Sequence, residues 1–235
     1  MADINYKRVT LLAGHYGSGK TNIAVNLALE IKKHYPVVIG DLDIVNPYYR
    51  TKDSQDELEK VGIDLISSPY ANTNLDIPAI PADFYRITND HSTYAVLDIG
   101  GDDQGAVALG RYVPALIEEN NFDMLFVANF RRPLTPNAED ALGVMREIET
   151  ACGLKFTGII NNTNLGAETT AQTVLDSVAE CEKLSHLSGL PIERTSVRED
   201  LADEVSQHVP DILALHLQKN LFKFKNPKEA TLWQK

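Results

Sequence analysis

Residues 8–21 have the sequence Arg-Val-Thr-Leu-Leu-Ala-Gly-His-Tyr-Gly-Ser-Gly-Lys-Thr, and this stretch decides the fold of the 235-residue chain. The apolar run Val9–Ala13 ends at a glycine, which predicts a short buried strand. Apolar residues then recur at helical spacing through residues 21–33, with Ile23, Leu27 and Ile31 on one face. The stretch therefore predicts a strand, a glycine-rich loop and a helix in direct succession.

The loop, residues 14–21, fits the phosphate-binding pattern G-x-x-x-x-G-K-[ST]. Its glycines allow positive φ and a close approach to a ligand, and successive N–H groups at a helix N-terminus form a concavity for anions. Lys20 would bring a positive charge to the β- and γ-phosphates, and the Thr21 hydroxyl would hold Mg²⁺. The alternative is a ligand-free glycine turn, but the strand–loop–helix context favours nucleotide binding. The expected contacts are Gly14, His15, Tyr16, Gly17, Ser18, Gly19, Lys20, Thr21 and Asn22.

Net charge, cysteine spacing and apolar run length exclude several classes of function. A formal net charge of −11 repels phosphate backbones, so we expect no nucleic-acid partner. Cys152 and Cys181 lack metal or redox spacing and are expected to be buried thiols of a reducing compartment. No signal peptide and no run of about 18 apolar residues is visible, which predicts a cytoplasmic protein without a membrane span.

Strand and helix patterns alternate along the rest of the chain, which predicts an α/β fold with a mostly parallel sheet flanked by helices. Strands are expected at 37–41, 63–67, 94–98, 123–128, 156–160 and 191–195. Helices are expected at 54–61, 83–87, 105–120, 136–152 and 169–187. We expect one domain over residues 1–235, with helices at about 201–224 packed on it and a tail at 225–235. Basic residues after 212–224 suggest a membrane anchor as the alternative to a packed helix.

Acidic residues follow two of these strands, whose carboxyl ends meet at one edge of a parallel sheet. Asp98 ends the strand at 94–98 and is expected to bind Mg²⁺ together with Thr21; a helix-capping role is the alternative. Asp41 and Asp43 are two residues apart at a strand end, so their side chains share a face. We expect Asp41 to join the Mg²⁺ ligands and Asp43 to act with Lys20 in catalysis by orienting water, although one of the pair can instead cap the loop.

Three segments carry a family resemblance: residues 14–21, 37–43 and 95–101. They occur in the same order and at similar spacing in the SIMIBI-class ATPases that include the ParA and MinD proteins, the nitrogenase iron protein and the CobQ/CobB nucleotide-binding domains. The chain resembles this superfamily over most of residues 8–200. The resemblance implies ATP and Mg²⁺ as ligands, a three-layer P-loop NTPase fold with seven or eight mostly parallel strands, and a nucleotide-gated homodimer.

The same resemblance assigns roles to single residues. It implies that Asp43 is the water-activating acid and that Asn162 recognises adenine, with Asn161 as the second choice, because an amide supplies both a donor and an acceptor. A turn-forming asparagine at a strand end is the alternative for either position.

The chain departs from the ParA and MinD pattern at one position. Their loops carry a signature lysine directly after the first glycine, which reaches the ATP of the partner subunit, whereas this chain has His15. Histidine is mostly neutral at pH 7 and too short to replace that lysine. Arg50, Arg131 and Arg132 lie just beyond strand ends and can supply the cation instead, with surface or structural roles as the alternative.

The expected function is Mg²⁺-dependent ATP hydrolysis that acts as a nucleotide-dependent switch through residues 41–50 and 98–105. One alternative is an ATP-dependent kinase or synthetase of the CobB/dethiobiotin synthetase kind, in which the loop at 69–90 covers a small-molecule acceptor. Another is a non-hydrolytic ATP-binding regulator of a protein partner. The missing lysine mildly favours the kinase or synthetase, because such enzymes need not exchange loops across a dimer.

Overall fold

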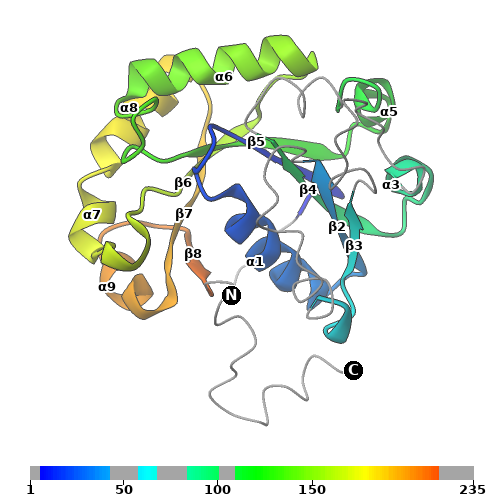
Figure 1. The fold of residues 1–235 in the computed structure, drawn as a ribbon, viewed down its shortest axis with the longest axis horizontal. Helices are drawn as coiled ribbons and strands as arrows, with labels where there is room; N and C mark the ends of the chain where they lie inside the picture. The colour runs from blue at the N-terminus through cyan, green and yellow to red at the C-terminus, as the bar shows by residue number, and fades with distance from the viewer. Residues whose placement is uncertain (1–5, 43–57, 68–83, 101–108, 217–235) are drawn as a thin grey trace, which may run out of the picture.

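The computed structural model describes residues 6–42, 58–67, 84–100 and 109–216, which form an eight-stranded parallel sheet with helices on both faces (Figure 1). The strand order is β3-β2-β4-β1-β5-β6-β7-β8. The strands are β1 (Val9–Ala13), β2 (Val37–Leu42), β3 (Asp64–Ser67), β4 (Tyr94–Ile99), β5 (Phe122–Ala128), β6 (Gly158–Asn161), β7 (Ile192–Arg198) and β8 (Ile212–Leu215). The helices are α1 (Lys20–Lys32), α3 (Tyr85–Asn89), α5 (Val113–Glu119), α6 (Ala138–Cys152), α7 (Ala171–Leu175), α8 (Val178–Ser188) and α9 (Ala202–Val205).

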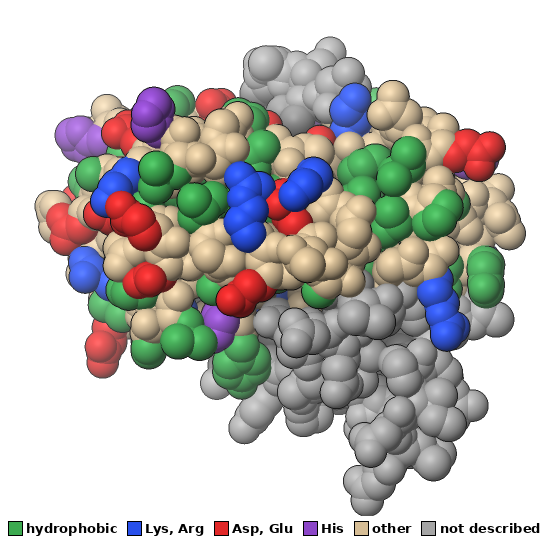
Figure 2. Space-filling view, turned by 90° about the horizontal axis from the view of Figure 1, so that it is seen from above, with side chains coloured by type: hydrophobic (Ala, Val, Ile, Leu, Met, Phe, Trp, Pro, Cys, Tyr) green, Lys and Arg blue, Asp and Glu red, His purple; other side chains and the backbone are tan. Residues whose placement is uncertain are grey.

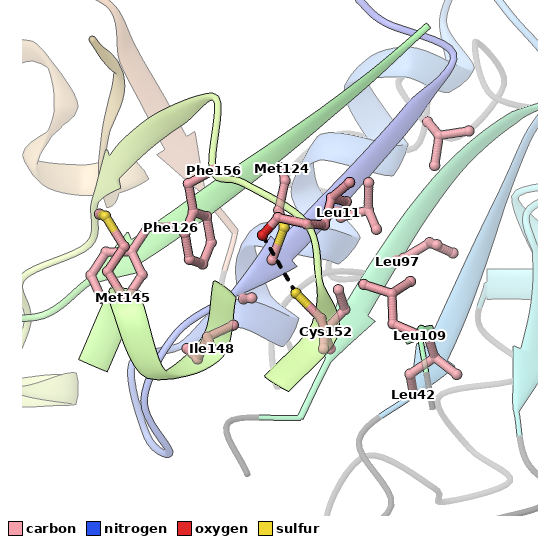
Figure 3. Close-up of a cluster of buried hydrophobic side chains, with 14 of the residues drawn as sticks. Leu11, Leu42, Leu97, Leu109, Met124, Phe126, Met145, Ile148, Cys152 and Phe156 are labelled. Atoms are coloured by element: carbon pink, nitrogen blue, oxygen red, sulfur yellow. Dashed lines mark hydrogen bonds between the residues drawn. The ribbon is translucent and has the colours of Figure 1, made fainter. Parts of the chain in front are cut away.

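Three apolar clusters hold the helices to the sheet, and the smallest of them packs α7 and α9 against β7. Leu11 and Leu12 are consecutive residues of β1 and point to opposite faces, as the pleat of a strand requires. Leu12 packs with α1, whereas Leu11 belongs to the larger layer beneath α5, α6 and α8. In that layer the rings of Phe126 and Phe156 meet edge to face, 5.3 Å between centroids, close to Met145 of α6 (Figure 3). The expected α/β fold with a parallel sheet is confirmed.

The order of the strands brings the predicted polar residues to one edge of the sheet. β1 lies between β4 and β5, and β2 lies beyond β4. In this register Leu12 pairs with Asp98, and Asp98 pairs with Asp41. Residues paired in a parallel ladder point to the same face, so both carboxylates lie on the face that α1 covers.

The predicted single helix at 169–187 is wrong, because the structure has two helices there. Thr170 caps α7 through a reciprocal pair of hydrogen bonds with Thr173, and the helix ends at Leu175. At the break, the Ser177 hydroxyl donates to Val174 O and accepts from Asn161 Nδ2 at 2.9 Å. Ser177 is thereby bonded to the carboxyl end of β6, and α8 starts at the next residue.

The predicted helical region at about 201–224 is confirmed at α9 but is wrong at residues 212–215, which form a strand. The short helix α9 is followed by β8, an edge strand that pairs in parallel with β7. Leu213 and Leu215 are buried and alternate with less buried neighbours, which is the two-residue period of a strand. The end of this strand is bonded to α1, because the Asn26 amide donates to His216 O and accepts from His216 N.

Surface charge on the face that carries α6 is mixed. Figure 2 shows acidic and basic side chains interspersed there, without a basic patch among the described residues. Both cysteines are buried thiols, as expected, and burial raises the pKa of Cys181 to about 12. Within the described part of the chain, no helix combines the length and apolar character needed to cross a membrane.

Candidate nucleotide-binding site

The glycine-rich loop turns from β1 into α1 through positions that only glycine fits. Gly19 has φ +91°, and a Cβ on it would lie 2.3 Å from Asn162 Nδ2. A Cβ on Gly14 would lie 2.5 Å from Val127 O, which is equally prohibitive. The loop therefore lies against the ends of β5 and β6, and its backbone can wrap an anion closely.

Lys20, the first residue of α1, is buried within this loop. Its Nζ donates to Gly14 O at 3.0 Å and to His15 O at 3.3 Å, so the ammonium group is held at the start of the loop. No described side chain caps the first turn of α1, and no acidic residue lies in that turn. The free N–H groups and the positive end of the helix dipole therefore remain available to a phosphate.

Three buried side-chain atoms around the loop are also unsatisfied. Ser18 Oγ, Asn22 Oδ1 and Arg132 Nε have no hydrogen-bond partner within the described part of the chain. Buried polar groups in folded proteins are nearly always paired, so such a cluster at one place indicates a site for a polar ligand.

The predicted Mg²⁺ ligands are brought together. The Thr21 hydroxyl donates a hydrogen bond to Asp98 Oδ2, and both Asp98 and its ladder neighbour Asp41 are buried. A hydroxyl and carboxylates are the hard oxygen ligands that Mg²⁺ prefers. Among the described residues, no group of three or more His, Cys, Asp or Glu side chains is placed to hold a metal ion by itself. This donor set fits a Mg²⁺ ion that takes its remaining ligands from nucleotide phosphates and water.

A cavity of about 440 Å³ opens beside the loop. This volume lies within the range of small-molecule sites. Its lining comes from the loop, the start of α1, the segments that follow β5 and β6, and the end of β7. The polar lining residues include Lys20, Thr21, Asn22, Arg132, Asn162, Asn164, Ser196 and Arg198. No carboxylate lies among the described lining residues, so the cavity suits an anionic ligand.

Asn162 lines this cavity but both ends of its amide are engaged. Nδ2 donates to Ser18 O at 2.6 Å, and Oδ1 accepts from Ser196 Oγ at 2.7 Å. In this structure Asn162 therefore holds the glycine-rich loop against the sheet, and its contact with adenine stays a prediction that requires these bonds to exchange. Asn161 has a different position, because its buried amide bonds Ser177 and Thr163.

The remaining predicted residues divide into two groups. Tyr16 lines the cavity, whereas the half-buried His15 contacts Tyr16 O through its Nδ1 at 2.9 Å and is not among the lining residues. Asp43 and Arg50, with most of the loop at 69–90 and of the segment at 99–105, lie outside the described residues.

Sequence analysis missed Asn164, Ser196 and Arg198, all of which line the cavity. The signal for the last two was weak because β7 was expected to end at 195, whereas it continues to Arg198. Asn164 was visible as the third asparagine within Asn161–Asn164, but only the fold brings it to the cavity.

Comparisons with known proteins identify the fold. No family model matches the sequence, and a search of curated proteins also finds no match. Solved structures of FtsY do match. The cell division protein FtsY of Thermotoga maritima has a TM-score of 0.53 and 20% identity, with 80% of this chain and 61% of that chain covered. FtsY of Mycoplasma mycoides has a TM-score of 0.55 and 16% identity, with 83% and 61% covered.

The signal recognition particle receptor FtsY of Elizabethkingia anophelis has a TM-score of 0.50 and 17% identity, with 98% of this chain and 66% of that chain covered. The chain has the fold of the P-loop NTPases. Its likeness to these FtsY structures is one of fold, and the chain spans about three fifths of the length of the first two. The expected fold is thus confirmed, whereas the narrower likeness to ParA and MinD stays a proposal.

Proposed function

We propose that this chain binds a Mg²⁺–nucleoside triphosphate at residues 14–22 and hydrolyses it, acting as a nucleotide-dependent switch. The observation that carries this proposal is the arrangement around Thr21. Its hydroxyl bonds Asp98 on one side, while on the other the adjacent Lys20 ammonium lies within the glycine-rich loop, next to the uncapped N-terminus of α1. A phosphate chain with its metal ion is the ligand that satisfies both halves of this arrangement.

Each residue has a distinct role in this proposal. Lys20 and the loop N–H groups bind and orient the phosphates and stabilise the negative charge that develops on them. Thr21, Asp98 and Asp41 would hold Mg²⁺, which supplies further charge neutralisation when bound. Asp43 would orient the attacking water and accept its proton.

We propose ATP as the nucleotide. The cavity is lined by the amides of Asn162 and Asn164 and by the hydroxyls of Thr163 and Ser196. These groups hydrogen-bond to the protein in this structure and would exchange those bonds for bonds to a base. Amides match the donor and acceptor that adenine presents side by side. Guanine adds an amino donor, which a carboxylate accepts best, and the described lining has none. Arg198 can serve guanine acceptors, so GTP is the competitor to test.

The loops at the cavity support an additional proposal, a second copy of the chain as the partner. Exposed large apolar side chains occur on three of these loops, at Tyr16, Leu134 and Leu165. Apolar side chains around a polar cavity are typical of a contact surface. A change in mass on addition of Mg²⁺ and a non-hydrolysable ATP analogue, followed by light scattering, tests this proposal; an unchanged monomer contradicts it.

Calorimetry with Lys20→Ala tests the central proposal. The variant should lose ATP binding, because it removes the only ammonium group in the described cavity lining. Lys33→Ala is the matched control, since Lys33 follows the opposite end of α1. Unchanged ATP affinity in Lys20→Ala would remove the assignment. A competition experiment between ATP and GTP shows which of the two bases the site prefers. Release of phosphate without an added acceptor molecule would show hydrolysis, whereas a kinase or synthetase would need the acceptor.

A further inference from the structure

Arg132 lies beside the glycine-rich loop although it comes from a distant part of the chain. It belongs to the segment between β5 and α6 and lines the cavity. Its Nε lies 3.5 Å, and its Cζ 3.6 Å, from the position that a Cβ on Gly17 would occupy. The guanidinium group therefore lies next to the middle of the loop, at a position where glycine has no side chain.

This guanidinium group has no anionic partner within the described residues. No described carboxylate forms an ion pair with Arg132, and its buried Nε donates no hydrogen bond. An arginine is always charged at physiological pH, and a buried donor without an acceptor is costly. The neighbouring Arg131 differs, because it pairs with Asp176 at 3.4 Å and is not among the cavity lining residues.

The backbone of this segment is held in place before any ligand arrives. Arg132 N donates to Asn129 O at 3.2 Å, and Thr135 N donates to Arg132 O at 3.1 Å. The fully buried Asn129 also joins this segment to the one after β6, because its Oδ1 accepts from Asn164 N at 3.3 Å. Arg132 therefore starts from a fixed backbone, which lowers the entropy lost when its side chain binds.

We propose that Arg132 binds the phosphates of the nucleotide held by its own chain, and so supplies the charge that His15 does not. A planar guanidinium group can donate two parallel hydrogen bonds to phosphate oxygens. The inference rests on the proposed function, since it needs a phosphate ligand in the loop. It makes the site complete within one chain, without a cation from a partner copy.

The test compares Arg132→Gln with Arg131→Gln, which makes the same change in charge one residue away. Arg132→Gln should weaken ATP binding by calorimetry by about 10- to 100-fold, the worth of one charged hydrogen bond, and leave adenosine binding unchanged. Arg131→Gln should bind ATP like the wild type. Arg132→Lys keeps the positive charge but cannot donate two parallel hydrogen bonds, so its ATP affinity should lie between those of Arg132→Gln and Arg131→Gln. Equal ATP affinities for the Arg132 and Arg131 variants would overturn the proposal.

Two further measurements separate the possible failures. If the wild type binds no nucleotide, the proposed function itself fails, whereas wild-type binding that Arg132→Gln leaves intact overturns only the role of Arg132. Thermal unfolding confirms that each variant is folded. Mixtures of Lys20→Ala and Arg132→Gln chains should show no more hydrolysis than the sum of the two alone. Recovered activity would mean that Arg132 acts across a dimer, against the same-chain assignment.

Discussion

Replacing Gly19 with alanine should lower the free energy of unfolding by about 1.5–3.5 kcal/mol. The backbone contributes about 1–2 kcal/mol, because φ is +91° at this position and an alanine there is strained. The new Cβ would lie 2.3 Å from Asn162 Nδ2, which must then move from Ser18 O, its acceptor at 2.6 Å. The lost hydrogen bond adds about 0.5–1.5 kcal/mol.

Gly153 provides a matched control for this substitution. It follows α6 with φ +74°, but no atom lies within 4 Å of the Cβ that alanine would add. Gly153→Ala should therefore cost only the backbone part, about 1–2 kcal/mol. Urea denaturation of both variants measures the difference, which we expect to be about 1 kcal/mol.

A double-mutant cycle with Asn162→Ala isolates the contact. In that background, Gly19→Ala should cost no more than Gly153→Ala, because the amide with which its Cβ collides is gone. The account of how the loop is held would be refuted if Gly19→Ala cost no more than Gly153→Ala in the wild type. A cost that Asn162→Ala leaves unchanged would refute it equally.

Three further predictions concern the metal ligands, the water and an ion pair. Asp98→Asn should remove most of the gain in ATP affinity that Mg²⁺ gives, about 10-fold or more, measured by calorimetry with and without a chelator. Asp43→Ala should bind ATP normally but hydrolyse it about 10²- to 10⁴-fold more slowly, and unaltered turnover would reject its catalytic role. Hydrogen bonds from Arg8 hold the pKa of Glu119 below its ordinary value of 4.5. The Arg8–Glu119 pair therefore stabilises the fold fully above pH 4.5. This stabilisation is lost as the pH falls through the lower pKa of Glu119 in the folded state. Glu119→Gln should flatten this acid dependence of thermal unfolding, and an unchanged profile would contradict the assignment.

The sequence was sufficient where short-range patterns determine the structure. The strand Val9–Ala13, the loop after it and α1 follow from an apolar run, three glycines and a helical period, all within 25 residues of one another. The acid at the end of β4 was predicted for the same reason, and the structure places Asp98 at Thr21.

The parts that sequence analysis got wrong depend on distant neighbours. Ile212–Leu215 is too short for its period to be decisive, and pairing with β7 makes it a strand. The helix break at Ser177 depends on a hydrogen bond from Asn161, 16 residues earlier. Arg131 and Arg132 are indistinguishable in the sequence, and only the fold pairs one with Asp176 and puts the other in the cavity.

A crystal structure of the chain with Mg²⁺ and a non-hydrolysable ATP analogue tests the central claim most directly. We predict that the phosphates lie within hydrogen-bond distance of the loop N–H groups and of Lys20 Nζ, with the metal ion next to Thr21 and Asp98. An analogue bound elsewhere, or a glycine-rich loop without phosphates at saturating analogue, would contradict the claim.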